Sequence, residues 1–228
     1  MDSVEEARVE TGKRSVLTAE ERARVEQAVQ AAERTTSAEI VPMIVDRSGL
    51  YRDAGHRAGV TLAILTLALL LTAEAGWLPW GWHAANAGWL LLAVIAAYGL
   101  GIWLGSFALV IRLFTSTDRM RHKVKLRAEV AFLSHGISRT RDRTGVLILL
   151  SLLEHHVYVL PDRPLIDRIP AERWDSVVAV IVKRVKDGDV VGGLYHGIEQ
   201  CGLVLAEYYP ARLGDNPDEL SNTLIQGE

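Results

Sequence analysis

Cysteine is nearly absent from this chain of 228 residues, in which Cys201 stands alone. A disulfide needs two cysteines, so none can form within one chain. The place of Cys201 in an apolar helical pattern indicates a small core side chain. A basic excess is also lacking, because 25 Lys and Arg residues stand against 28 Asp and Glu residues. Nucleic-acid-binding domains carry a basic surface, so this balance argues against a nucleic-acid partner.

Charge is missing from one long stretch of the chain. Between Ala58 and Ile111 the one charged residue is Glu74, although 23% of the whole chain is charged. A helix needs about 20 apolar residues to cross roughly 30 Å of hydrocarbon, and this stretch has room for two. We expect these elements in order: a transmembrane helix at 58–78, an external turn at 79–87 and a second transmembrane helix at 88–111.

The two ends of this stretch differ in charge from the turn between the helices. The turn has no Lys or Arg. Trp77 just before it and Trp80 within it fit an aromatic belt, beside an interfacial Glu74. The outer ends are basic, which places both termini in the cytoplasm of a multi-pass cell-membrane protein. Basic residues after the second helix should also contact anionic lipid headgroups. The chief ones are Arg119, Arg121, Lys123 and Lys125.

Small residues recur in the second predicted span. Ala97, Gly101 and Gly105 follow one another at four-residue spacing. Small side chains on one face let two helix backbones approach closely. The pattern fits packing within the hairpin, and it also fits association between copies of the chain.

The polar flanks carry ordinary helix and strand signals. Thr18 and Glu21 form a capping box at the start of a predicted helix. A β-branched strand follows at 40–45, where Pro42 favours a sheet edge or an irregularity. Residues 145–150 are a continuous apolar run, as in a strand buried on both faces. Further along the chain we expect a helix at 121–135, a strand at 156–160 and two closing helices with Trp174, Val177 and Ile181 and with Leu194, Ile198, Cys201 and Leu205 on their apolar faces.

The N-terminal helix and strand bury too little apolar surface to form a core alone. They therefore belong with the second flank in one discontinuous cytoplasmic domain, made of residues 16–50 and 120–213. The expected class is α/β, a small mixed sheet flanked by helices and interrupted by the two-helix transmembrane hairpin. Residues 1–15 and 214–228 are expected to be tails.

Several separated motifs resemble the TPM domain family. They are Glu33-Arg-Thr-Thr-Ser-Ala-Glu-Ile-Val41, Thr140-Arg-Asp-Arg-Thr-Gly-Val-Leu-Ile148, Ser151-Leu-Leu-Glu154, Val159-Leu-Pro-Asp162, Trp174, Gly188 and Tyr209-Pro210. The resemblance covers roughly residues 16–225. Within the family, the chain is similar to a bacterial membrane subgroup. It implies a TPM-like fold and membrane association. Other members of the family include a protein with acid phosphatase activity, an accessory subunit of a receptor and a calcium-binding protein.

A phosphatase would need a nucleophile or a metal, and groups that neutralise phosphate. Asp142, Glu154 and Asp162 lie near predicted strand ends and could bind Mg²⁺ or Ca²⁺ through oxygen. Arg139 and Arg143 could hold phosphate. Each of these residues also fits an ordinary solvated turn, so no cofactor is fixed by the pattern.

Three functions remain open. The first is a membrane accessory protein whose cytoplasmic domain binds or stabilises a membrane-protein partner. The alternative is a membrane-anchored, metal-dependent phosphatase-like hydrolase, which follows from the family alone. A transporter is disfavoured, because two helices with few polar residues would have to oligomerise to enclose a path.

Overall fold

The computed structural model describes residues 17–76, 84–212 and 219–227. The chain forms two compact units, one made of Met1–Ser48 with Val124–Glu228 and the other of Gly49–Lys123. Each unit is described by itself. The predicted tail at 1–15 and most of the predicted turn at 79–87 lie outside the described residues, as do the side chains of Glu74, Trp77 and Trp80.

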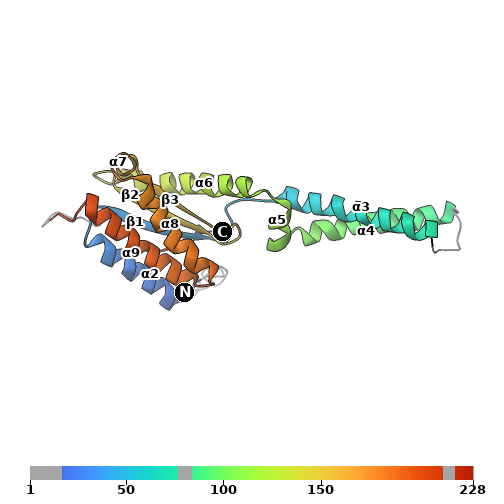
Figure 1. Ribbon diagram of the computed structural model, residues 1–228, viewed down its shortest axis with the longest axis horizontal. Coiled ribbons are helices and arrows are strands. Elements are labelled where there is room, and N and C mark those ends of the chain that lie inside the picture. The colour runs from blue at the N-terminus through green and yellow to red at the C-terminus, as the bar shows by residue number, and fades with distance from the viewer. Residues whose placement is uncertain (1–16, 77–83, 213–218, 228) are drawn as a thin grey trace, which may run out of the picture. The chain divides into compact units, whose positions relative to one another are not determined.

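The first unit contains a four-stranded sheet with the order β3-β2-β1-β4. β1 (Glu39–Val45) pairs in parallel with β2 (Gly145–Ser151) and with β4 (Ile225–Gly227). β2 pairs antiparallel with β3 (His156–Pro161). The sheet is therefore mixed, and the predicted α/β class with a small mixed sheet is confirmed (Figure 1).

Helices cover both faces of this sheet (Figure 1). On one face α2 (Ala19–Glu33), α8 (Ala171–Lys186) and α9 (Val190–Tyr208) bury Ile40, Ile44 and Ile148. On the other face α6 (Thr117–Ser134) contributes Val124, Ala128 and Phe132, which pack against Leu147 and Leu149. Two-sided burial explains why β2 reads as an unbroken apolar run. The shorter helices are η2 (Ile137–Arg139) and α7 (Arg163–Arg168).

The start of α2 matches the sequence prediction. The Thr18 side chain accepts a hydrogen bond from the Glu21 backbone N–H, and the Glu21 carboxylate accepts one from Thr18 N at 2.8 Å. These two bonds satisfy donors that the first turn of a helix leaves free. The backbone and side-chain hydrogen bonds from Thr18 lower the pKa of Glu21.

Pro42 lies in an inner strand, so the prediction of a sheet edge is wrong. β1 is buried along its whole length, with β2 paired to all seven residues and β4 paired to the last three. The N–H of Glu39 points to Thr144 of the β2 side, whereas that of Ile40 points away, to the Glu33 carboxylate. Alternation along the strand puts position 42 on the β4 side, where pairing begins only at Met43. No ladder hydrogen bond is lost there.

The predicted C-terminal tail at 214–228 contributes to the sheet, which corrects that prediction. Ile225–Gly227 forms β4. Leu224 is buried in the core beside α2, and Arg22 of α2 donates to Gln226 Oε1 at 2.9 Å. Three residues are too few to give a strand signal in the sequence.

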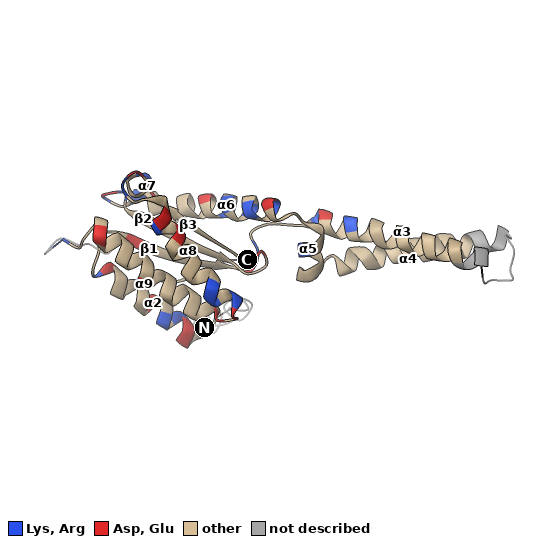
Figure 2. Ribbon diagram, viewed as in Figure 1, with Lys and Arg blue, Asp and Glu red and all other residues tan. Residues whose placement is uncertain are grey.

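The second unit holds the apolar helices α3 (Arg52–Gly76), α4 (Ala84–Leu104) and α5 (Ala108–Phe114). Figure 2 shows α4 without charge and the charges of α3 near its start. Within the described residues, one helical segment, Arg52–Thr72 of α3, is by itself long enough and apolar enough to cross a membrane. Gly88–Leu104 and Ala108–Phe114 pass the same test only as a pair bent by 104°. The second helix predicted at 88–111 is therefore broken after Leu104.

Small residues lie where α3 crosses α4. A Cβ on Gly101 would lie 2.5 Å from Gly59 Cα, and one on Gly105 would lie 2.2 Å from Gly55 Cα. Ala97 is also buried. The structure thus places Gly101 of α4, and Gly105 directly after α4, against two glycines of α3. The sequence interpretation did not single out those two glycines of α3. Such close approach needs residues without side chains.

Candidate functional site

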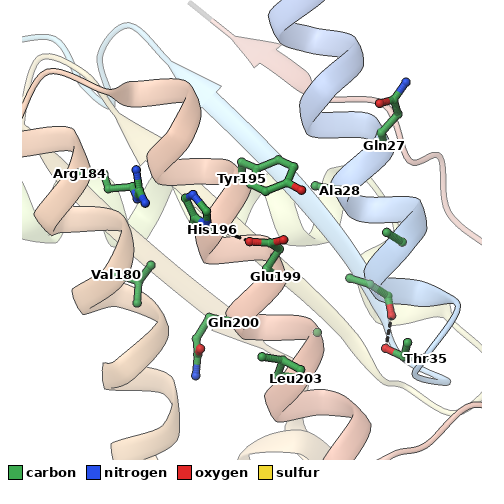
Figure 3. A pocket seen from close by; sticks show the side chains of 13 residues that line it. Gln27, Ala28, Thr35, Val180, Arg184, Tyr195, His196, Glu199, Gln200 and Leu203 are labelled. Atoms are coloured by element: carbon green, nitrogen blue, oxygen red, sulfur yellow. Dashed lines mark hydrogen bonds and ion pairs between the residues drawn. The ribbon is translucent and has the colours of Figure 1, made fainter.

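A groove opens on the surface formed by α2, α8 and α9 of the first unit. It has a volume of about 760 Å³. Figure 3 shows side chains from all three helices around it. Those the figure labels are Gln27, Ala28, Thr35, Val180, Arg184, Tyr195, His196, Glu199, Gln200 and Leu203.

The floor of the groove is made of small side chains. A Cβ on Gly202 would lie 2.7 Å from Ala32 Cβ, so Gly202 allows α9 to approach α2 closely. Ala28 and Ala31 extend this floor along α2. Leu203 stands at its edge and is 68% exposed. The floor and Leu203 together offer an apolar surface to an incoming segment.

The rim of the groove is polar and carries both signs of charge. His196 Nδ1 lies 2.7 Å from Glu199 Oε2, and both residues belong to α9. Arg184 of α8 pairs with Asp189 Oδ2 at 3.4 Å. Exposed pairs of this kind add little stability, so these groups are available to orient a bound segment through hydrogen bonds.

A second polar cluster lies at the carboxyl ends of β1 and β2. Glu154 is buried and accepts hydrogen bonds from Ser48 N at 2.8 Å and from the Ser151 hydroxyl. The Ser48 hydroxyl donates to Ser151 Oγ at 2.8 Å. The cluster ties the segment after β1 to the β2–β3 turn. Glu154, one of the predicted metal ligands, here accepts hydrogen bonds from the fold itself.

The other two predicted metal ligands are elsewhere. Asp162 follows β3, at the opposite end of that strand from Glu154. It caps α7 and pairs with Arg143 at 3.2 Å. Asp142 pairs with Arg212 at 2.8 Å. The three carboxylates therefore do not converge.

One atom of Asp162 has no hydrogen-bond partner in the described part of the chain: its Oδ2, which is buried. The residues that can be described contain no group of three or more His, Cys, Asp or Glu able to hold a metal ion. A single carboxylate oxygen is a poor match for Mg²⁺ or Ca²⁺, each of which takes six or more oxygen ligands.

The predicted headgroup residues are divided between the two units. Arg119 pairs with Asp53 in the second unit, and the side-chain carbons of Lys123 lie beside Gly49. Arg121 lies 4.0 Å from Asp118, and Lys125 lies 3.8 Å from Glu129. Arg139 ends η2 and is exposed. Arg139 and Arg143 lie in the first unit, and Arg143 is already paired with a carboxylate.

The groove was missed in the sequence interpretation. The stripe of α9 that includes Leu194, Ile198 and Cys201 is buried as predicted. Leu203 falls outside that stripe, and a large apolar residue off the core face is the signal that could have indicated a binding surface.

Two comparisons with known proteins found similarity, one to a family model and one to a solved structure. Residues 106–204 match the family model described as the TPM domain. This part of the chain is therefore similar to a TPM domain. The NMR structure of BA42 protein from the psychrophilic bacteria Bizionia argentinensis sp. nov. is similar in fold, with a TM-score of 0.59 and 21% identity. That match covers 94% of this chain and 97% of the BA42 chain. No curated protein matches this sequence.

The residues matched to the TPM domain leave out α2 and β1. In this chain β1 is nevertheless an inner strand, paired with β2 over seven residues. α2 supplies one wall of the groove. The sheet that contains the matched strands β2 and β3 is thus completed by the segment that precedes the apolar unit.

Proposed function

We propose that this chain is an integral membrane accessory protein of the cell membrane, with the TPM domain and both termini on the cytoplasmic side. The apolar hairpin of α3 and α4 supports this proposal. Exposed large side chains such as Ile64, Leu69, Leu92 and Ile95 would be costly in water, and hydrocarbon accommodates them. The basic ends of the hairpin favour the cytoplasmic placement.

The groove between α2 and α9 carries the second half of the proposal, a membrane-protein partner. A helix that lies in a groove presents apolar residues at every third or fourth position. The Ala28 and Gly202 floor suits small apolar side chains of such a helix, with Leu203 packing beside them. The polar rim would then set its register through Glu199 and Gln200.

The test places a photo-crosslinking amino acid at Leu203 of the full chain in native membranes. The matched control is Leu133 of α6, which is 67% exposed on the other side of the sheet. We expect a crosslinked membrane protein of one defined mass from position 203 and a much weaker product from position 133. The substitution Leu203→Glu should lower the amount of this membrane protein that co-purifies with the chain several-fold. Equal products from both positions, or products that contain this chain alone, would contradict the proposal.

Hydrolysis of phosphate esters, the alternative that the family suggests, stays a prediction. Its candidate ligands Asp142, Glu154 and Asp162 each make ion pairs or hydrogen bonds within the fold.

A further inference from the structure

α5 is a short apolar helix that turns away from α4. α4 ends at Leu104, and the axis of α5 lies at 104° to it. Phe107 has extended backbone angles of φ −81° and ψ 138° and begins α5 without a side-chain cap. The turn is closed by backbone hydrogen bonds from Ser106 to Trp103 and from Phe107 to Leu104.

The bend is held by contacts within the second unit. Ile111 of α5 is buried. Arg57 of α3 donates to the backbone oxygen of Phe114 at 3.1 Å, which satisfies a carbonyl at the end of α5. Asp53 pairs with Arg57 at 3.8 Å and also with Arg119. These bonds tie the end of α5 to the first turns of α3.

The outer side of α5 is apolar and unusually exposed. Leu109 is 77% exposed and Leu113 is 74% exposed, and the two are one helical turn apart. Phe107 precedes them and packs edge-on against Trp103, with ring centroids 5.2 Å apart. This surface continues the apolar surface of α4, where Leu100 and Trp103 are also exposed.

Basic side chains lie in α5 and beside its end. Arg57 and Arg119 join at Asp53, and Arg112 lies in the last turn of α5. An apolar helix face bordered by basic side chains is the pattern of a helix that lies in a membrane interface. Anionic headgroups complement the charge, while the acyl boundary accepts the leucines.

We propose that α5 lies along the surface of an anionic membrane, with Leu109 and Leu113 inserted at the boundary between headgroups and acyl chains. This inference rests on the proposed membrane hairpin. It deepens that proposal by assigning the end of the second span to Leu104 and the contact with anionic lipid to α5. α4 has 21 residues, which at 1.5 Å each is about the thickness of the hydrocarbon.

Site-directed spin labelling of the full chain tests this assignment. Nitroxides are placed one at a time at Leu109, Leu113 and Ile95 in a Cys201→Ala background, in vesicles of phosphatidylcholine with one third phosphatidylglycerol. Depth is measured from the relative effects of oxygen and of a water-soluble relaxing agent. Ile95 is 59% exposed on α4 and serves as the control inside the span.

We expect Ile95 to be deep, and Leu109 and Leu113 to be shallow and at nearly equal depth. A straight continuation of α4 would instead separate the latter two by about 6 Å along the membrane normal. A separation of that size, or labels at 109 and 113 in water while Ile95 is in lipid, would overturn the assignment of α5 alone. A water-exposed label at Ile95 would overturn the membrane hairpin itself.

The lipid composition tests the role of charge. In vesicles of phosphatidylcholine alone, the labels on α5 should lose part of their oxygen exposure, while the label at Ile95 should be unchanged. Equal depths of the α5 labels in the two kinds of vesicle would contradict the contact with anionic headgroups.

Discussion

The burial of Cys201 in the core changes the chemistry of its thiol. It is fully buried on the sheet-facing side of α9, together with Ile198 and Leu205. Burial raises the pKa of the Cys201 thiol to about 12, because the charged thiolate would lose its hydration. The thiol is therefore neutral and shielded in the folded protein.

We predict that a thiol reagent modifies Cys201 roughly 1,000-fold more slowly in the folded protein than in the unfolded chain at pH 8, because the thiolate fraction differs by about that factor.

The buried Cys201 thiol also makes the stability depend on pH, because in the folded state it keeps its proton above the pKa of the unfolded thiol. Stability should therefore fall as the pH rises from about 9 toward 12. Denaturant titrations at several pH values measure this decline.

The Cys201→Ala variant provides the control for the pH dependence, since it lacks the titrating thiol. Its stability should fall less between pH 9 and 11 than that of the parent chain. Fast modification of Cys201 under native conditions would contradict the burial.

Sequence periodicity could predict the burial of Cys201 but not the place of Leu203 at the groove. Cys201 lies on a stripe with Leu194 and Ile198, and a stripe at helical spacing predicts the core face of its helix. Leu203 lines a groove only because it lies beside Ala28 and Ala32 of α2, which are about 170 residues earlier in the chain. Such a groove depends on tertiary packing, which spacing along one helix does not contain.

At the scale of elements, the crossing of α3 and α4 depends on glycines from both helices. Gly101 faces Gly59 and Gly105 faces Gly55. Gly99, on the same helix, has nothing within 4 Å of the position where a Cβ would lie. The two environments on α4 make a matched comparison possible.

We predict that Gly101→Ala destabilises the hairpin by about 1–3 kcal/mol, because its Cβ would lie 2.5 Å from Gly59 Cα. Gly99→Ala should be neutral or stabilising by up to about 1 kcal/mol, since alanine favours a helix. Thermal unfolding in detergent micelles, followed by circular dichroism, measures both.

Equal effects of the two substitutions would contradict the proposed crossing. Light scattering on the same samples examines the other interpretation of the small residues. If they joined two copies of the chain, Gly101→Ala would lower the molar mass of the complex rather than the melting temperature of a single hairpin.

The break after Leu104 shows what an apolar run leaves undetermined. Residues 88–111 are apolar throughout, so hydropathy alone fits one continuous helix. The bend depends on the close contact between Gly105 and Gly55 and on the bond from Arg57 to Phe114. Both contacts join segments about 50 residues apart, and neither leaves a local signal.

At the scale of the molecule, the sheet joins two distant segments of the chain. β1 and β2 pair in parallel from Glu39↔Gly145 to Val45↔Ser151, with the apolar unit between them in sequence. The need of each flank for a partner made this pairing predictable. The register and β4 were not, because they depend on contacts such as that between Arg22 and Gln226.

Parallel pairing across the apolar unit also constrains topology. Both flanks must lie in the same compartment if they are to form one sheet. An insertion with two spans satisfies this condition, whereas an odd number of spans cannot.

Reporter fusions test this central claim most directly. A fluorescent protein that folds only in the cytoplasm and a phosphatase active only outside it are fused, one at a time, to each terminus of the full chain. We predict fluorescence at both termini, no phosphatase activity at either, and retention of the protein in the membrane fraction after an alkaline wash. Phosphatase activity at either terminus, or recovery of the chain in the aqueous fraction, would contradict the account.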